Sequence, residues 1–380
     1  MFLSQVVRTF VKEPAIALDM CAAPGGKSTL LRDSLPEGSL LVANEVMPQR
    51  AQVLAENLMK WGHPGVVVTH SDSAEFTPLK HFFDVILTDV PCSGEGMFRK
   101  DEVAVKEWSM ENVDTCWQRQ RMIVENVWPS LKPGGLLIYS TCTFNLWEDE
   151  LNVRWIKETL GAEVLEVPVQ EEWKITSALG GESMPVYRFL PHKTVGEGLF
   201  MAVLRKNGDE ACETPLRKKD KKNKQGKKQP AVSPVPKECK SWLKESSAYL
   251  YQWHRDHVMA FPKQFQEQWE ILSSAVNVIH AGISLATLKG KDVIPDHSLA
   301  MSQVAEDVFP RCELTYAQAV AYLRKEAILL DSDAPRGFVL LTYRNMPLGF
   351  VKNIGNRANN LYPQEWRIRS GYTPEELLVL

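Results

Sequence analysis

The sequence predicts an α/β protein in which a doubly wound, mainly parallel sheet is followed by a smaller α+β region. Apolar runs alternate with helical patterns over residues 1–204, which is typical of βαβ units. A glycine-bearing turn joins the first apolar run to the first helical pattern. A basic, Lys- and Pro-rich stretch then interrupts the alternation. We therefore expect a domain at 1–206, a linker at 207–237 and a C-terminal region at 238–380.

The predicted elements follow one another in the order of such a fold. Strands are expected at 16–21, 40–45, 66–70, 84–89, 135–140, 163–167 and 198–205, and helices at 28–35, 49–61, 115–131 and 148–160. Lys-Pro-Gly-Gly at 132–135 predicts a helix end directly before a strand. Near the C-terminus, FVLLTYRNMPLGFVKNIG predicts a hairpin with Asn-Met-Pro at its turn.

The composition excludes several classes of protein. Of the 380 residues, 44% are hydrophobic and 24% are charged, which excludes wholesale disorder and a collagen-like fibre. No stretch reaches the roughly 18 consecutive apolar residues of a membrane span, and the first residues lack the apolar core of a signal peptide. Seven cysteines without a CxxC pair indicate neither a disulfide framework nor a metal site. We expect a cytoplasmic protein with reduced thiols, no metal and no membrane contact.

The net charge of -3 is unevenly distributed along the chain. Residues 1–204 carry a net charge of -9, residues 205–228 carry +6, and residues 229–380 are neutral. A partner with a phosphate backbone must therefore be held by local basic surface, because the overall field does not attract it. The basic run at 217–228 favours a solvated linker over a specific contact.

Three consecutive strands are expected to end in an acidic residue. In the motif LDMCAAPGGKS an Asp ends the first strand, and the glycine turn after it lets a ligand approach the backbone and a helix N-terminus. Glu45 ends the second strand, where an acid can accept hydrogen bonds from ribose hydroxyls, and Asp72 follows the third. Either acid could instead cap a helix, and the turn is neither a GxGxxG fingerprint nor a P-loop. Their shared edge favours a nucleoside site.

Two cysteines follow the next two strands. Cys92 lies in DVPCSG after the fourth strand, and Cys142 lies in STCTFN after the fifth. In a sheet of order 3-2-1-4-5 these strands are neighbours, and their carboxyl ends face the crevice where ligands bind. Both thiols are therefore expected to face one pocket. For the cysteines at 116, 212, 239 and 312 we expect the ordinary role of a small apolar side chain.

The motifs LDMCAAPGGKS, DVPCSGEGMFRK and STCTFN together resemble those of the Nol/Nop/Sun family of RNA (cytosine-5-)-methyltransferases. The later segments PDHSLAM and PLGFVKNIGNRANNLYPQEWR resemble the C-terminal part of the RsmF-like 16S rRNA methyltransferase branch. The resemblance implies a Rossmann-like domain that uses S-adenosylmethionine, followed by a PUA-like RNA-binding region. It also implies that relatives carry an N-terminal RNA-binding lobe that this sequence lacks.

The resemblance also implies roles for individual residues. Cys142 would be the nucleophile, Cys92 would assist release, and Asp89 would hydrogen-bond the base and lie near the methyl donor. The cofactor contacts that it implies are Ala23, Pro24, Gly25, Gly26, Lys27, Glu45 on the ribose and Asp72 on the adenine amino group. Arg50, one turn into the helix after Glu45, could also contact the ribose or be an ordinary solvated helix residue. The chemistry suits two thiols, because a thiolate that adds to carbon 6 of cytosine makes carbon 5 nucleophilic.

Contacts with RNA are less well defined by the sequence. Arg99 and Lys100 follow the Cys92 loop, and Arg357 and Arg367 lie among aromatic residues near the C-terminus, a combination that suits RNA. The expected partner is ribosomal RNA, with transfer RNA as an alternative, and a monomer is expected. A second class of function also stays open: a catalytically idle RNA-binding or ribosome-assembly factor. A small-molecule methyltransferase is the weakest hypothesis, because it explains neither the linker nor the C-terminal region.

Overall fold

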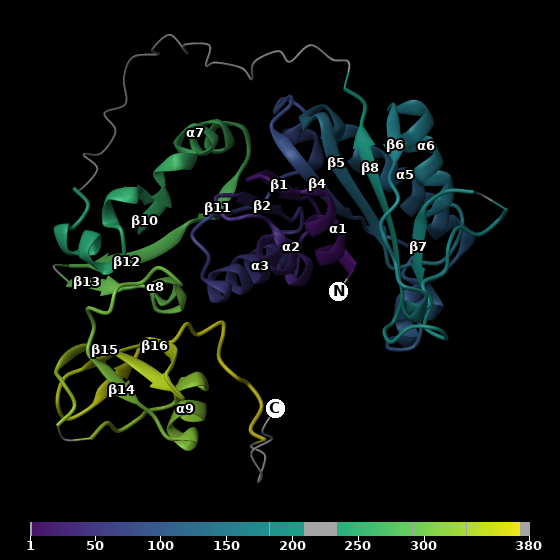
Figure 1. Ribbon diagram of the computed structural model, residues 1–380. Coiled ribbons are helices and arrows are strands. Elements are labelled where there is room, and N and C mark those ends of the chain that lie inside the picture. The colour runs from purple at the N-terminus through teal and green to yellow at the C-terminus, as the bar shows by residue number, and fades with distance from the viewer. Residues whose placement is uncertain (1, 182, 209–233, 291, 332, 373–380) are drawn as a thin grey trace. The chain divides into compact units, whose positions relative to one another are not determined.

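The computed structural model describes residues 2–181, 183–208, 234–290, 292–331 and 333–372 (Figure 1). These residues form two compact units. The first is drawn from the described residues within 2–58, 65–208 and 265–280, and the second from those within 59–64, 234–264 and 281–372. Most of the predicted linker, including the basic run at 217–228, lies outside the described residues. Among the described helices, none is both long and apolar enough to cross a membrane.

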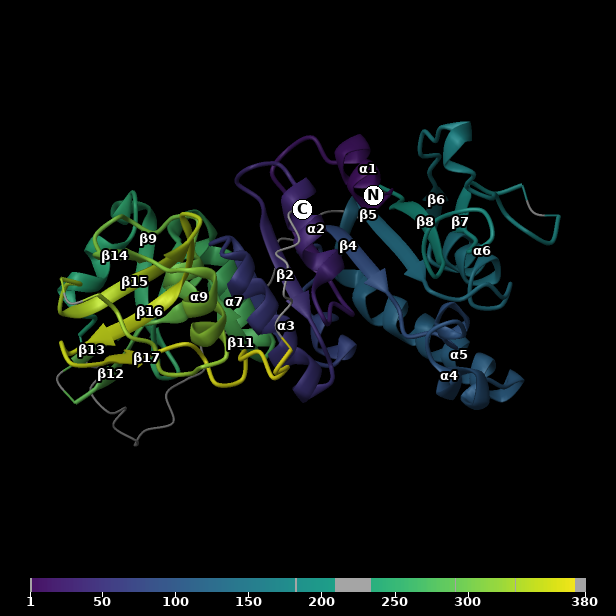
Figure 2. The same ribbon diagram turned by 90° about the horizontal axis from the view of Figure 1, so that it is seen from below.

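The first unit is built on one large sheet in the order β11-β3-β2-β1-β4-β5-β8-β6, with β7 paired to β8 (Figures 1 and 2). Strands β1 to β5 are parallel, and β6, β7 and β8 run antiparallel to their neighbours. The strands are β1 (Ile16–Asp19), β2 (Leu40–Asn44), β3 (Val66–Thr69), β4 (Phe83–Asp89), β5 (Leu131–Thr141), β6 (Ala162–Val164), β7 (Val186–Phe189), β8 (Leu199–Lys206) and β11 (Val278–Ala281). The predicted fold class and the order 3-2-1-4-5 are confirmed, and β4 and β5 are neighbours.

Helices flank this sheet. They are α1 (Phe2–Phe10), α2 (Gly26–Ser34), α3 (Pro48–Trp61), α4 (Glu102–Glu107), α5 (Met110–Val127), α6 (Glu150–Thr159) and α7 (Gln266–Ala275). Four of them, α2, α3, α5 and α6, correspond to predicted helices, whereas α1 and α4 were not predicted. The helix expected at 115–131 begins earlier, because the Ser109 side chain accepts a hydrogen bond from the Asn112 N–H and caps α5 at Met110.

The predicted helix end at 132–135 is wrong in one respect, because these residues already belong to β5. Helix α5 ends at Val127, a 3₁₀ turn covers Trp128–Ser130, and β5 begins at Leu131. Leu131 pairs with Phe83, and the register shifts before Val85 pairs with Leu136. Such an irregularity lets a strand contain proline and glycine that would interrupt a regular ladder.

The last strand of the large sheet comes from far along the chain. β11 continues the sheet beyond β3, and in Figure 1 it is the green strand on the side of β2 away from β1. The His70 N–H donates to the Asn277 carbonyl at 2.9 Å, and the Asn277 N–H donates to Ser71 Oγ at 2.9 Å. Residues 265–280 thus complete the first unit, an arrangement that the predicted division at 207–237 does not anticipate.

The second unit contains two four-stranded sheets, in the orders β13-β12-β10-β9 and β14-β15-β16-β17. Its elements are β9 (Tyr249–His254), β10 (His257–Pro262), β12 (Ile283–Lys289), β13 (Asp292–Pro295), α8 (His297–Met301), β14 (Arg311–Glu313), α9 (Tyr316–Leu323), β15 (Gly337–Tyr343), β16 (Met346–Asn353) and β17 (Ala358–Asn360). The α+β prediction is confirmed. The hairpin is also present, but its turn is Arg344–Asn345, both with positive φ, and Met346 already begins β16.

Candidate active site

The glycine turn after β1 places the N-terminus of α2 at the carboxyl edge of the sheet. Gly25 adopts φ 114° at the cap of α2, a conformation that other residues rarely reach. A Cβ built at Gly26 would meet no heavy atom within 4 Å, so the first turn of the helix is open on this side. The free backbone N–H groups of a helix start therefore line this edge.

Asp19, the last residue of β1, is a buried carboxyl group with one unused oxygen. Its Oδ2 accepts a hydrogen bond from Ser28 Oγ at 2.7 Å, whereas its buried Oδ1 has no hydrogen-bond partner among the described residues. Burial raises the pKa of Asp19 to about 7, although the Ser28 hydrogen bond opposes the shift. The site thus holds an acceptor that still needs a donor.

Glu45 and Arg50 are linked to the same turn. Glu45 follows β2, is buried, and accepts a hydrogen bond from the Met47 N–H at 2.9 Å. Arg50 Nη2 lies 3.5 Å from Glu45 Oε2 and donates to the Ala23 carbonyl at 2.9 Å. Arg50 is therefore not a freely solvated helix residue, since it joins the acid at the end of β2 to the glycine turn.

Asp72 behaves as a helix cap. Its side chain is exposed and accepts a hydrogen bond from the Ala74 N–H at 2.9 Å, and Glu75 bonds back to the Asp72 N–H at 3.0 Å. This reciprocal capping box starts the 3₁₀ turn Ser73–Phe76. The capping alternative is thus present in the structure, and any contact with a ligand is additional to it.

Asp89 connects three elements at the end of β4. Its Oδ2 accepts a hydrogen bond from Lys27 Nζ at 2.8 Å, and its Oδ1 accepts from Ser140 Oγ at 2.7 Å. Burial lowers the pKa of Lys27, but the Asp89 carboxylate more than offsets this, and the pKa is raised overall. A persistent positive charge therefore lies beside Asp89 at the start of α2.

The two predicted thiols meet. Cys92 Sγ and Cys142 Sγ lie 3.0 Å apart, and both side chains are partly buried. The hydrogen bond from Cys92 lowers the pKa of Cys142, with burial and the Asp89 charge opposing this shift and Lys27 supporting it. The same hydrogen bond raises the pKa of Cys92. Cys142 is thus suited to be the thiolate and Cys92 to keep its proton.

Close backbone packing joins the two cysteine loops. The Gly96 N–H donates to the Cys142 carbonyl at 2.8 Å, and a Cβ at position 96 would lie 2.5 Å from that oxygen. Only glycine fits this approach without displacing the loop. Two buried residues that sequence reasoning missed, Gln120 and Glu148, also bind the Cys92 loop.

Comparison with known proteins assigns the family. Residues 10–205 match the family model of 16S rRNA methyltransferase RsmB/F, and residues 309–368 match that of the methyltransferase RsmF PUA domain. The chain is 32% identical over 363 residues to ribosomal RNA small subunit methyltransferase F of Escherichia coli O9:H4 (strain HS), covering 93% of this chain and 73% of the relative.

This chain belongs to the RsmB/F methyltransferase family.

A second curated relative agrees with this assignment. The protein of the same name from Shigella boydii serotype 4 (strain Sb227) is 31% identical, with coverage of 93% of this chain and 73% of the relative. The crystal structure of NSun6 from Pyrococcus horikoshii with SFG is 30% identical, covers 55% of this chain and 51% of that chain, and has a TM-score of 0.47. The predicted resemblance, the methyltransferase domain and the PUA-like region are confirmed, as is an S-adenosylmethionine-dependent RNA methyltransferase class.

The edge of the RsmB/F domain described above fits S-adenosylmethionine. The unpartnered Asp19 Oδ1 suits a donor such as the ammonium group of the methionine part. The buried Glu45 suits the ribose hydroxyls, because an acid at the end of a second strand takes this role in nucleotide-binding sheets. Asp19 belonged to the motif noted in the sequence but was not singled out as a site residue. The signal that marks it is its burial, which the sequence does not show.

The residues predicted to contact RNA are exposed. Arg99 donates to Glu197 at 2.9 Å and to the Gly196 carbonyl at 2.8 Å, and Lys100 lies 3.7 Å from Glu197. Arg357 and Arg367 are exposed in the second unit. The neighbouring aromatic rings have structural roles, since Tyr362 and Trp366 pack edge-on against the buried ring of His297.

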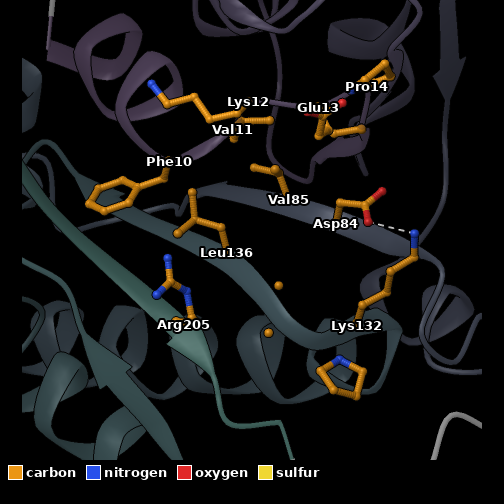
Figure 3. A pocket seen from close by; sticks show the side chains of 14 residues that line it. Phe10, Val11, Lys12, Glu13, Pro14, Asp84, Val85, Lys132, Leu136 and Arg205 are labelled. Atoms are coloured by element: carbon orange, nitrogen blue, oxygen red, sulfur yellow. Dashed lines mark hydrogen bonds and ion pairs between the residues drawn. The ribbon is translucent and has the colours of Figure 1, made fainter.

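A separate hollow lies at the opposite edge of the RsmB/F sheet (Figure 3). Asp84 and Lys132, at the starts of β4 and β5, form an ion pair of 2.7 Å in its wall, and Phe10 and Arg205 also line it. Ligands of doubly wound sheets bind at the carboxyl ends of the strands. This hollow is at the other ends and is not part of the candidate active site.

Proposed function

We propose that this protein transfers a methyl group from S-adenosylmethionine to carbon 5 of a cytosine in RNA, with 16S ribosomal RNA as the substrate. The observation that carries the proposal is the pair of thiols at the carboxyl ends of β4 and β5, with Sγ atoms 3.0 Å apart. Their opposite pKa shifts divide the roles, because one sulfur is prepared to attack and the other to keep a proton. Relatives named for small-subunit rRNA support the choice of RNA.

The Cys142 thiolate adds to carbon 6 of the cytosine. A C6–S bond forms, and the electron pair of the C5–C6 double bond becomes available at carbon 5. Bound S-adenosylmethionine would supply the methyl group to carbon 5, with its S–CH₃ bond breaking and S-adenosylhomocysteine leaving. The carbon-5 proton is then lost to water, the double bond re-forms, and the C6–S bond breaks with its electron pair returning to sulfur. Cys92 assists this release by donating its S–H to the departing Cys142 sulfur.

Asp89 would hold the base. Its two oxygens accept from Lys27 and Ser140, and its side chain is 29% exposed, so an amino group of cytosine can reach it. A hydrogen bond there stabilises the charge that develops in the ring as the thiolate adds. The Lys27 ammonium, 2.8 Å from Asp89, would keep that carboxylate oriented.

The remaining cofactor contacts follow the edge of the sheet. Residues 23–27 would hold the methionine and ribose portion. Arg50 would fix the position of Glu45 relative to the glycine turn, because it contacts both. Asp72 would contact the adenine amino group from its capping position at the end of β3. RNA would be bound by the PUA-like region and by basic residues, among which Arg99, Lys100, Arg357 and Arg367 are the candidates. We further propose a cytoplasmic monomer.

The test is to trap the covalent complex. We expect Cys92→Ala, mixed with total bacterial RNA and S-adenosylmethionine, to accumulate a protein–RNA adduct on a denaturing gel, because release is slowed. The Cys92→Ala/Cys142→Ala double variant should form none, and Cys116→Ala, which changes a buried cysteine on α5, should behave like the wild type. Sequencing the trapped RNA identifies the target and separates ribosomal from transfer RNA.

An absent adduct would overturn the covalent mechanism if the same sample still binds S-adenosylmethionine by calorimetry. If, in addition, wild-type protein transfers no methyl group while its RNA affinity is unchanged by Cys142→Ala, the protein is an idle RNA-binding factor and the proposed activity is wrong.

A further inference from the structure

Between the two cysteine loops lies a buried carboxylate, Glu148, whose side chain is fully enclosed. Glu148 Oε2 accepts hydrogen bonds from the Ser93 N–H at 3.0 Å and from Gln120 Nε2 at 2.6 Å. Its Oε1 accepts from Asn145 Nδ2 at 2.8 Å. Both oxygens therefore accept hydrogen bonds from groups on or beside the two loops, and this satisfies the buried carboxylate.

On one side this carboxylate fixes the backbone around Cys92. It binds the N–H of the following residue, Ser93, while Gln120 Nε2 also donates to the carbonyl of the preceding residue, Pro91, at 2.9 Å. The orientation of the Gln120 amide is set independently, because its Oε1 accepts from Asn152 Nδ2 at 2.8 Å and from the Tyr139 hydroxyl at 3.1 Å. The backbone on both sides of Cys92 is thus held by hydrogen bonds to Gln120 and Glu148.

On the other side the same carboxylate holds the Cys142 loop. Asn145, three residues after Cys142, donates through Nδ2 to Glu148 and accepts from the Glu148 N–H at 3.0 Å. The Asn145 amide also donates to Thr143 Oγ1 at 3.1 Å, and Thr143 Oγ1 lies 3.1 Å from Ser93 Oγ. One side chain therefore connects the residues that flank both sulfurs.

We propose that Glu148 is a positioning residue that holds the Cys92 thiol within hydrogen-bonding distance of the Cys142 sulfur. Its use in catalysis rests on the proposed function, but the geometry it maintains does not. A carboxylate is needed because all three partners are donors. A glutamine at this position has one acceptor oxygen and directs its NH₂ at a donor. The hydrogen bonds to one of the two cysteine loops are then lost.

The consequence is measurable at Cys142. The charged groups that face this thiol are Asp89, which raises its pKa, and Lys27, which lowers it, and neither is bonded to Glu148. The largest influence is the hydrogen bond from Cys92. If Cys92 moves away, the pKa of Cys142 rises, and the thiolate fraction near neutral pH falls.

We would measure alkylation of Cys142 by iodoacetamide as a function of pH in the full-length chain, following the Cys142 peptide by mass spectrometry. Glu148→Gln is expected to raise the apparent pKa of Cys142 and thereby to slow its alkylation at pH 7 on the order of tenfold. Cys92→Ala should give a shift of similar size. Adding Glu148→Gln to Cys92→Ala should change nothing further, because the two act through one hydrogen bond. Glu158→Gln, an exposed position on α6, is the matched control and should leave the profile unchanged.

An unchanged profile in Glu148→Gln overturns the proposal. So does an equal additional shift in the Cys92→Ala background, since Glu148 would then act on Cys142 without Cys92. If Glu148→Gln shows no cooperative unfolding transition, Asn145→Ala, which cuts the link on the Cys142 side, decides instead: a shift in the same direction supports the proposal and an unchanged profile rejects it. Alkylation needs neither RNA nor cofactor. A negative alkylation result would therefore reject the positioning role of Glu148 without bearing on methyl transfer, and an absence of methyl transfer would not affect the alkylation result.

Discussion

In this site, burial affects the protonation and hydrogen bonding of single residues even without a ligand. Asp19 is the clearest case, because it is fully buried with one oxygen in use and one without a partner among the described residues. Desolvation raises its pKa to about 7, so the carboxyl group is largely protonated below neutral pH. A cationic group of the cofactor would favour the ionised form.

From this we expect the affinity for S-adenosylmethionine to depend on pH. Between pH 5.5 and pH 7 the ionised fraction of Asp19 rises, so calorimetry should show binding that tightens on the order of tenfold over this range. Asp19→Asn, which cannot ionise, should bind weakly and lose this dependence. Asp33→Asn, an exposed position on α2, serves as the control and should retain it. Equal affinities at both pH values in the wild type would exclude Asp19 as the partner of a cation.

Sequence reasoning identified the residues that lie in motifs and missed those that support them. Cys92, Cys142 and Asp89 are recognisable because they follow apolar strands that a parallel sheet brings to one edge. Glu148 and Gln120 carry no such signal, since their partners lie 55 and 29 residues away along the chain. A buried hydrogen bond of this kind depends on how α5 and the β5–α6 loop pack, which one sequence does not show.

At the scale of elements, a short strand fixes the end of the catalytic loop. Arg188 on β7 is fully buried; its Nε donates to Glu150 at 2.8 Å, its Nη1 lies 3.0 Å from Asp149, and it also donates to the Phe144 carbonyl at 3.0 Å. Burial raises the pKa of Asp149, and Arg188 opposes this rise. The start of α6 and the loop after Cys142 are therefore held by one cation.

Removing that cation should destabilise the protein strongly. In Arg188→Leu two buried carboxyl groups lose their partner, and the free energy of unfolding in urea should fall by about 3–5 kcal/mol. The deficit should be larger at pH 8 than at pH 5, because Asp149 without Arg188 is more easily protonated at the lower pH. Arg119→Leu on the exposed side of α5 should change stability by less than about 0.5 kcal/mol. A similarly small loss of stability in Arg188→Leu would show that the contacts of Arg188 with Asp149 and Glu150 contribute little to stability.

Strand β7 is also an element that the apolar pattern of the sequence does not predict. Strands β1 to β5 were predicted because they are nearly continuous apolar runs, as buried parallel strands are. β7 has four residues and contains a buried arginine, so its apolar signal is interrupted. The start of β5 was misplaced because its proline and glycines, which usually end elements, are accommodated by a shift in register against β4.

At the scale of the whole molecule, the active-site residues and the basic residues of the PUA-like region that could attract RNA lie in different parts of the chain. Residues 1–204 contain both cysteines and the cofactor edge but carry a net charge of -9. Attraction for a polyanion must therefore come from local basic positions. The PUA-like second unit offers exposed arginines for this purpose, and the cofactor edge lies wholly within the first unit.

We accordingly expect Arg357→Ala/Arg367→Ala to lower the affinity for RNA several-fold and to reduce the slope of log affinity against log salt by about 2. Filter binding over a range of salt concentrations measures both, and affinity for S-adenosylmethionine should be unchanged. Arg311→Ala, whose arginine is already paired with Asp307 at 2.8 Å in the same unit, is the control. An unaltered salt slope in the double variant would place the RNA contacts elsewhere.

The position of β11 has a consequence for the order in which the protein can be completed. β3 has left the ribosome long before residue 281 is made, and at about 5–20 residues per second the interval is roughly 10–40 s. During that time the hydrogen-bonding groups of β3 that later pair with β11 form a free sheet edge, which is a template for pairing with other chains. A fragment ending at residue 206 keeps that edge permanently, and we expect it to aggregate where the full chain does not.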